Sequence, residues 1–131
     1  MSPYWGSAGG IMIIVSPMTI DQITQQIRAF RDERDWMQFH NPKDMAMAIS
    51  IEAAELQELF LWVTPEQSHA RAQERIEKVR EEIADIGIYL MELADNLGID
   101  LLAAMDEKLR KNAVKYPVEK AKGSNAKYNE L

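Results

Sequence analysis

Apolar side chains recur at steps of three and four residues along most of the chain after residue 18, a spacing that places them on one face of an α-helix. This pattern predicts four helices, each opened by a residue type that commonly caps a helix N-terminus. They run from Thr19 through Phe30, from Asn41 to about Trp62, from Thr64 to Gly98 with a break near the start, and from Asp100 to just before Tyr116-Pro117.

The helix starts and the absence of strand signals together define the fold class. Thr64 and Gln67 have the spacing of a capping box, and Pro42 suits the first helical position. No segment of useful length alternates between apolar and polar residues, and no Asn-Gly or Asp-Gly hairpin signal occurs, so no sheet is expected. The predicted class is all-α, and the short connections favour an antiparallel four-helix bundle.

Length and composition fit one domain, since the chain has 131 residues of which 47% are hydrophobic. We expect a flexible leader or a segment added for expression over 1–17, a helical domain over 18–117 and an irregular tail over 118–131. No apolar run approaches the roughly 20 residues of a membrane helix. No cysteine occurs, which favours the cytoplasm. The net charge of −6 argues against nucleic-acid binding, which needs a basic face.

Two acidic residues lie within the apolar stripe of the second predicted helix. At about 100° per residue, Glu52 and Glu55 both fall among apolar neighbours, whereas Glu58 lies nearer the edge of the stripe. A buried carboxylate without a partner costs several kcal/mol. No Lys or Arg occurs between Lys43 and Arg71, so no local cation compensates these acids.

The third predicted helix carries a second inward pair of acids. Glu82 points into its apolar arc and Asp85 borders that arc, while Glu81 and Glu92 are assigned to the solvent side. Solvated charge with i,i+4 pairing, such as Lys78 with Glu82, is the alternative interpretation of this acidic run. Two antiparallel helices would bring four carboxylates together, which a divalent cation makes tolerable. Oxygen-only ligands favour Mg²⁺ or Mn²⁺ over zinc.

The residues around these acids resemble a known family of enzymes. The paired patterns Glu-x-x-Glu and Glu-x-x-Asp on successive helices look like the metal site of the all-α nucleotide pyrophosphohydrolases, the MazG-like superfamily. The likeness is greatest to its dCTP pyrophosphatase branch, and it covers about residues 19–131. The segments that carry it, in order, are 33–40 (ERDWMQFH), 52–62 (EAAELQELFLW), 81–90 (EEIADIGIYL), 108–117 (KLRKNAVKYP) and 123–131 (GSNAKYNEL).

This resemblance implies a role for each residue of the predicted site. The magnesium ligands would be Glu52, Glu55, Glu82 and Asp85, and Glu58 would orient the attacking water. Phosphate contacts are implied for Lys108, Asn112, Lys115 and Tyr116 on the last helix. The nucleobase pocket would draw on Trp36, Phe39, His40, Trp62 and Tyr89. Some members of the branch have a histidine nine positions before the tryptophan, where this chain has Ile27, so the base preference is open.

The function predicted is magnesium-dependent hydrolysis of nucleoside triphosphates, dCTP or modified deoxynucleotides, to the monophosphate and pyrophosphate. This would be a house-cleaning role in the nucleotide pool by a homo-oligomer, a dimer or tetramer that shares its site between subunits. A helical dUTP diphosphatase and a phosphoribosyl-ATP pyrophosphohydrolase are alternatives that would use much the same acids. A non-catalytic adaptor or antitoxin-like protein, whose inward acids receive basic residues of a partner, is a third.

Overall fold

A computed structural model describes residues 4–8, 11–15 and 18–131. The chain divides into two compact units, Met1–Leu93 and Ala94–Leu131. The boundary falls near the end of a long helix, inside the region 18–117 for which one domain is predicted. Each unit is therefore described by itself.

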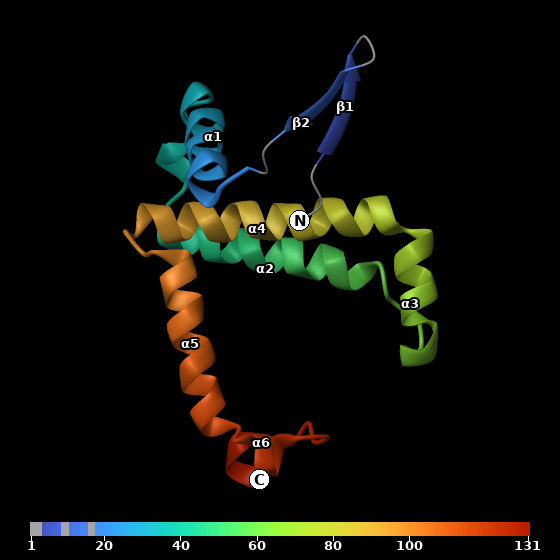
Figure 1. Ribbon diagram of the computed structural model, residues 1–131. Helices are drawn as coiled ribbons and strands as arrows, with labels where there is room; N and C mark the ends of the chain where they lie inside the picture. Colours follow the sequence, from blue (N-terminus) through green and yellow to red (C-terminus); the bar gives the residue numbers. More distant parts are fainter. Residues whose placement is uncertain (1–3, 9–10, 16–17) are drawn as a thin grey trace. The chain divides into compact units, whose positions relative to one another are not determined.

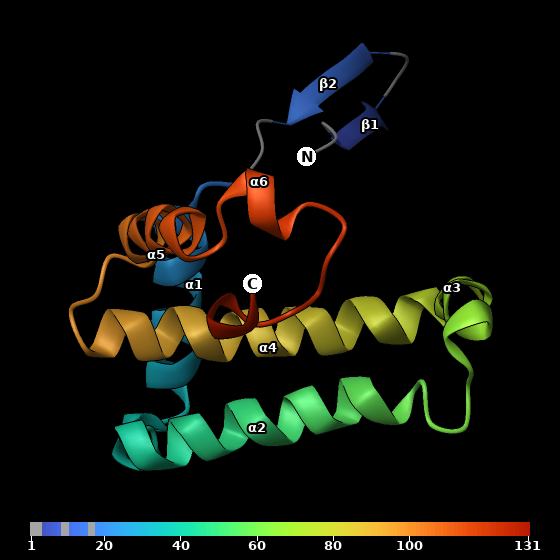
Figure 2. The same ribbon diagram turned by 90° about the horizontal axis from the view of Figure 1, so that it is seen from below.

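The helices of the first unit are α1 (Ile20–Glu33), the 3-10 turn η1 (Met37–Phe39), α2 (Pro42–Glu58), α3 (Pro65–Glu74) and most of α4 (Ile76–Asn96). Figures 1 and 2 show α2 and α4 running side by side in opposite directions, joined through α3, with α1 crossing them near one end. The second unit contains the end of α4, then α5 (Leu101–Lys115), α6 (Val118–Ala121) and the 3-10 turn η2 (Tyr128–Glu130).

Side-chain caps fix the helix starts where the sequence predicts them. The backbone amide of Gln22 donates to Oγ1 of Thr19 at 3.1 Å, and the Gln22 side chain accepts from the amide of Thr19, completing a capping box. Asn41 caps α2 by accepting from the amide of Asp44 at 2.9 Å. Asp100 caps α5 in the same way. The all-α class is confirmed for the chain from Ile20 onward, while the four-helix bundle remains a prediction.

Two helix boundaries refine the predictions made for 41–98. The helix α2 ends at Glu58 rather than at Trp62, because the amides of Phe60 and Leu61 bond three residues back and tighten the backbone out of the α-helical pattern. Trp62 then takes a positive φ of 64°. The break predicted near the start of the third helix is confirmed at Arg75, which separates α3 from α4.

The expectation that the chain contains no strand is wrong. An antiparallel hairpin pairs β1 (Tyr4–Ala8) with β2 (Ile11–Val15). The sequence of β2 is a continuous run rich in β-branched residues, which favours strand without showing period-two alternation. The rest of the predicted leader, residues 1–3, 9–10 and 16–17, lies outside the described residues. The tail 118–131, expected to be irregular, contains the short helix α6 and the turn η2.

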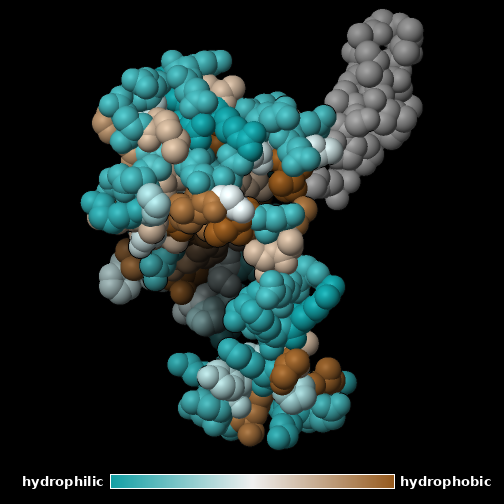
Figure 3. Space-filling view, turned by 90° about the vertical axis from the view of Figure 1, so that its left-hand side faces the viewer, coloured by the Kyte–Doolittle hydropathy of each residue, from teal (hydrophilic) through white to brown (hydrophobic). Residues whose placement is uncertain are grey.

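Few large side chains of the described chain are fully buried. The buried apolar residues are Ile27, Met45, Leu59, Val79 and Ala94. Met45 on α2 is 1% exposed, the most buried large side chain of the described chain. Many other apolar side chains reach the surface, as the brown areas of Figure 3 show. No described helix is long and apolar enough to cross a membrane.

Candidate functional site

Three carboxylates converge where α2 and α4 run side by side. Glu52 comes from α2, and Glu82 and Asp85 come from successive turns of α4. One oxygen from each lies within 4.8 Å of the other two. Glu82 is only 2% exposed, and the other two side chains are half-buried. The antiparallel pairing of the helices therefore brings Glu52 to two acids that lie 30 and 33 positions later in the chain.

The acidic cluster is not satisfied by the described residues around it. Oε2 of Glu52 and Oε2 of Glu82 are both buried, and neither has a hydrogen-bond partner within the described part of the chain. Burial is the main cause that raises the pKa of Glu52 to about 7, followed by its hydrogen bond to Glu55 and the negative charges of Glu55, Asp85 and Glu82. The cluster thus needs more positive charge than the described residues supply.

Lys78 supplies part of that charge from one turn before Glu82. Its Nζ lies 3.0 Å from Oε1 of Glu82. This hydrogen bond and the accompanying charge hold the pKa of Glu82 below its ordinary value, and they raise the pKa of Lys78. The ion pair of Lys78 with Glu82, which the alternative interpretation of a solvated face predicts, is present. The Glu82 side chain is nevertheless buried.

The donor set fits a divalent cation. All of its atoms are carboxylate oxygens, two of them buried and unpartnered, which is the chemistry that Mg²⁺ and Mn²⁺ prefer. Glu55 has an exposed side chain that interacts with Glu52, although it is not one of the three converging acids. Glu58 is exposed and lies outside the acidic cluster.

A cavity of about 400 Å³ opens beside the acidic cluster, with Asp85 in its wall. Its other lining residues come from α1, from the turn before α2 and from α4: Ile23, Gln26, Ile27, Phe30, Arg31, Trp36, His40, Ile88, Tyr89 and Glu92. Burial raises the pKa of Tyr89. A largely apolar cavity with a few polar groups is typical of a small-molecule site.

Only some of the residues predicted to bind the nucleobase line this cavity. Trp36, His40 and Tyr89 line the cavity, whereas Phe39 and Trp62 do not. The Trp36 ring lies 6.3 Å from that of His40 between ring centres. Phe39 is largely exposed, and Trp62, which is 92% exposed, follows the end of α2. The structure therefore brings three of the five residues to one cavity.

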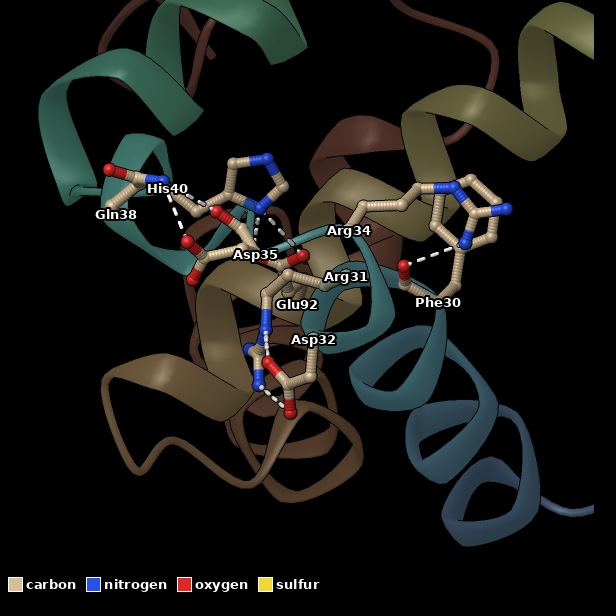
Figure 4. A network of polar contacts seen from close by, with 8 residues as sticks. All are labelled: Phe30, Arg31, Asp32, Arg34, Asp35, Gln38, His40 and Glu92. Atoms are coloured by element: carbon tan, nitrogen blue, oxygen red, sulfur yellow. Dashed lines mark hydrogen bonds and ion pairs between the residues drawn. The ribbon is translucent and has the colours of Figure 1, made fainter.

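Glu92 corrects the sequence analysis, which assigned it to solvent. It is 4% exposed, and its two carboxylate oxygens lie 2.9 and 2.8 Å from Nδ1 of His40 (Figure 4). A usable signal was present in the sequence, because Glu92 follows Asp85 by seven residues and thus shares its face of α4. The neighbouring solvent assignment, for Glu81, is confirmed.

The predicted phosphate contacts all lie on or just after α5, in the second unit. Lys108, Lys115 and Tyr116 are exposed, and Asn112 is half-buried. The Nζ atom of Lys115 lies 4.9 Å from the centre of the Tyr128 ring, a cation–π contact. The rings of Tyr116 and Tyr128 meet edge to face at 6.2 Å. Tyr128, which is not among the predicted site residues, therefore contacts both Lys115 and Tyr116.

Comparison with known proteins places this arrangement in a family. The sequence model of the MazG-like family matches residues 47–131, which include the whole acidic cluster. The chain belongs to the MazG-like family. Among its MazG-like relatives, dCTP pyrophosphatase 1 of Bos taurus is 37% identical over 127 residues, covering 95% of this chain and 75% of the relative. The Homo sapiens protein of the same name is 36% identical over 115 residues, covering 86% and 68%.

A solved structure supports the same placement of the MazG-like chain. A pyrophosphatase from Archaeoglobus fulgidus superposes with a TM-score of 0.74 at 39% sequence identity. The match covers 80% of this chain and 98% of the archaeal one. The likeness thus extends to fold and sequence together.

Proposed function

We propose that this protein hydrolyses dCTP and related deoxynucleoside triphosphates to the monophosphate and pyrophosphate, with Mg²⁺ held by Glu52, Glu82 and Asp85 and assisted by Glu55. The observation that carries the proposal is the pair of buried carboxylate oxygens without partners, on Glu52 and Glu82. Converging acids that each keep a buried, unpartnered oxygen are stabilised by a divalent cation. A phosphate-rich substrate then needs that same cation.

The class of activity follows from the family. The chain is a nucleoside triphosphate pyrophosphohydrolase, as its dCTP pyrophosphatase relatives and its pyrophosphatase structural neighbour indicate. dCTP is the substrate in the names of the curated relatives, and we extend it to this chain. We further propose that it works in the cytoplasm, where it would remove unwanted nucleotides from the pool.

The proposed role of each residue follows from its position in the acidic cluster or in the cavity. A bound divalent cation would neutralise developing negative charge on the phosphates. Asp85 belongs to both the acidic cluster and the cavity wall, so it would fix the substrate's phosphates relative to its base. Trp36 and Tyr89 would hold the base by stacking. Catalysis would then rest on positioning and electrostatics.

The remaining predicted roles concern water and the phosphate chain. We propose that Lys108, Asn112, Lys115 and Tyr116 donate hydrogen bonds to phosphate oxygens, which charged donors bind strongly. The exposure of Lys108, Lys115 and Tyr116 supports this role. Orientation of the attacking water by Glu58 stays a prediction, since Glu58 does not join the acidic cluster.

We also propose that the protein is a homo-oligomer, a dimer or tetramer. Ile51 and Ile83 are each more than half exposed, and they flank Glu52 and Glu82 in sequence. Apolar side chains that adjoin a site and face outward are typical of an interface. A second copy that covers them would bring the two sites close to the interface. Sedimentation equilibrium would show a dimer or tetramer, and the paired change Ile51→Glu with Ile83→Glu should dissociate it.

The experiment that tests the function is pyrophosphate release from a panel of deoxy and ribo triphosphates, with Mg²⁺ or with chelator. Glu81 and Glu82 form a matched pair, because they are adjacent in sequence and only Glu82 is buried. Glu82→Gln should lower kcat/KM at least about a hundredfold. Glu81→Gln should stay within about twofold of the parent. Folded parent protein that releases no pyrophosphate from any triphosphate would refute the proposal and favour a non-catalytic adaptor.

A further inference from the structure

A buried polar pair lies in the cavity outside the acidic cluster. Glu92 belongs to α4 and His40 precedes α2, and their side chains are 4% and 17% exposed. Glu92 is not one of the three converging acids. Burying a carboxylate is costly, so a sequence that needed only an apolar wall here would not place one. Hydrolysis as proposed above does not use Glu92.

The location of this pair suggests contact with the nucleobase. His40 and Glu92 line the same cavity as Asp85, together with aromatic side chains and the buried Arg31. Phe30 and Trp36 meet edge to face at 5.7 Å between ring centres, and His40 continues that aromatic row. A base that stacks on Trp36 would therefore have His40 within reach of its edge. In an apolar pocket, such isolated polar groups set the orientation and identity of the ligand.

The chemistry of the pair defines what it can recognise. An ionised carboxylate only accepts hydrogen bonds, so Nδ1 of His40 must carry the proton that it donates to Glu92. In the singly protonated ring Nε2 then carries no proton and is an acceptor. Glu92 thus fixes the tautomer of His40, as second partners of functional histidines commonly do. An acceptor at this point suits an amino group and disfavours a carbonyl oxygen.

We propose that Glu92 and His40 read the exocyclic edge of the nucleobase and select 4-aminopyrimidines over 4-oxopyrimidines. The inference rests on the proposed function and gives it a source of base selectivity. In this arrangement His40 accepts from the amino group of cytosine, and Glu92 acts as a positioning residue through it. A uracil carbonyl would instead face the Nε2 lone pair, leaving two acceptors unpaired in a buried site, which is strongly rejected.

The test compares kcat/KM for dCTP and dUTP at alkaline pH, which favours the singly protonated ring. The parent should prefer dCTP. Glu92→Gln can present its amide N–H to Nδ1 and thereby favour the opposite tautomer, so it should lower the dCTP-to-dUTP ratio about tenfold or more. The loss should come mainly from a higher KM for dCTP. Glu92→Asp, which keeps a carboxylate, should restore part of the ratio, and Glu81→Gln should leave it unchanged.

A spectroscopic readout separates positioning from mere structural support. The chain has two histidines, so the ¹⁵N signals of His40 can be assigned by replacing His69. They should report a proton on Nδ1 in the parent and a shift toward Nε2 in Glu92→Gln. A parent without preference for dCTP, or a folded Glu92→Gln with an unchanged ratio and tautomer, would overturn this inference alone. Absence of any triphosphate turnover by the parent would overturn the proposed function and this inference together.

Discussion

The substitution Glu52→Gln should stabilise the metal-free protein above neutral pH. The amide has nearly the shape of the carboxyl group and no charge to bury. The pKa of Glu52 is raised from 4.5 to about 7 in the folded chain, chiefly by burial and then by Glu55. That difference corresponds to roughly 3 kcal/mol at about 1.4 kcal/mol per pH unit. Because the side chain is partly exposed, solvent screening should reduce the effect to about 1–2 kcal/mol.

The pH at which this difference develops follows from the direction of the shift. Below pH 4.5 Glu52 is protonated in both the folded and the unfolded chain, so the parent and Glu52→Gln should be equally stable. Between 4.5 and about 7 the unfolded chain loses its proton first, so the parent loses stability as the pH rises. Above about 7 the gap should be constant.

The assay is thermal and urea unfolding in chelator at pH 4, 6 and 8. At pH 8 the Gln variant should melt about 3–8 °C above the parent. Glu58→Gln, an exposed change on the same helix, is the matched control and should show no such gap. With Mg²⁺ and a nucleotide analogue the order should reverse, because only the parent keeps the full set of ligands. A Gln variant that is equal to or less stable than the parent at pH 8 in chelator would refute the reasoning.

Two further changes probe the core and the cation of the acidic cluster. Met45→Ala removes the most buried large side chain and should lower the free energy of unfolding, measured in urea, by about 2–5 kcal/mol. Met47 is half-exposed, so Met47→Ala should lower it much less. Similar losses at both positions would contradict the assigned core. Lys78→Met should destabilise the metal-free protein at pH 7. The loss should shrink as the pH falls below the ordinary carboxyl pKa and through the lowered pKa of Glu82, and melting curves that differ equally at every pH would count against it.

Much of the helical architecture could be predicted because local chemistry determines it. Capping by Thr19, Asn41 and Asp100 depends on residues three positions apart, and the structure has each cap in place. The hairpin over Tyr4–Ala8 and Ile11–Val15 was missed because a run of β-branched residues without alternation was read as leader. The early end of α2 depends on tight backbone bonds that apolar periodicity does not reveal.

The acidic cluster could be predicted from the sequence, whereas the pairing of Glu92 and the cavity beside it could not. The acids of α2 stand out in the sequence because their own helix offers them no nearby cation. The acids of α4 stand out because they repeat the spacing of three residues. The burial of Glu92 has a local signal in its spacing from Asp85, whereas its pairing with His40, 52 positions away, has none. The cavity likewise depends on the packing of three segments. Interactions within one helix turn can be read from sequence, whereas those between helices need the fold.

The contact between Lys78 and Glu82 has a consequence for metal binding at the proposed site. The ammonium group of Lys78 already lies 3.0 Å from Oε1 of Glu82, so a cation in the proposed metal site would share Glu82 with a positive charge. If the proposed site binds a divalent cation, its affinity should be weaker than the carboxylates alone would give, because the ammonium group repels the cation. Substitution at position 78 would therefore tune the metal concentration at which the enzyme switches on, without changing any ligand.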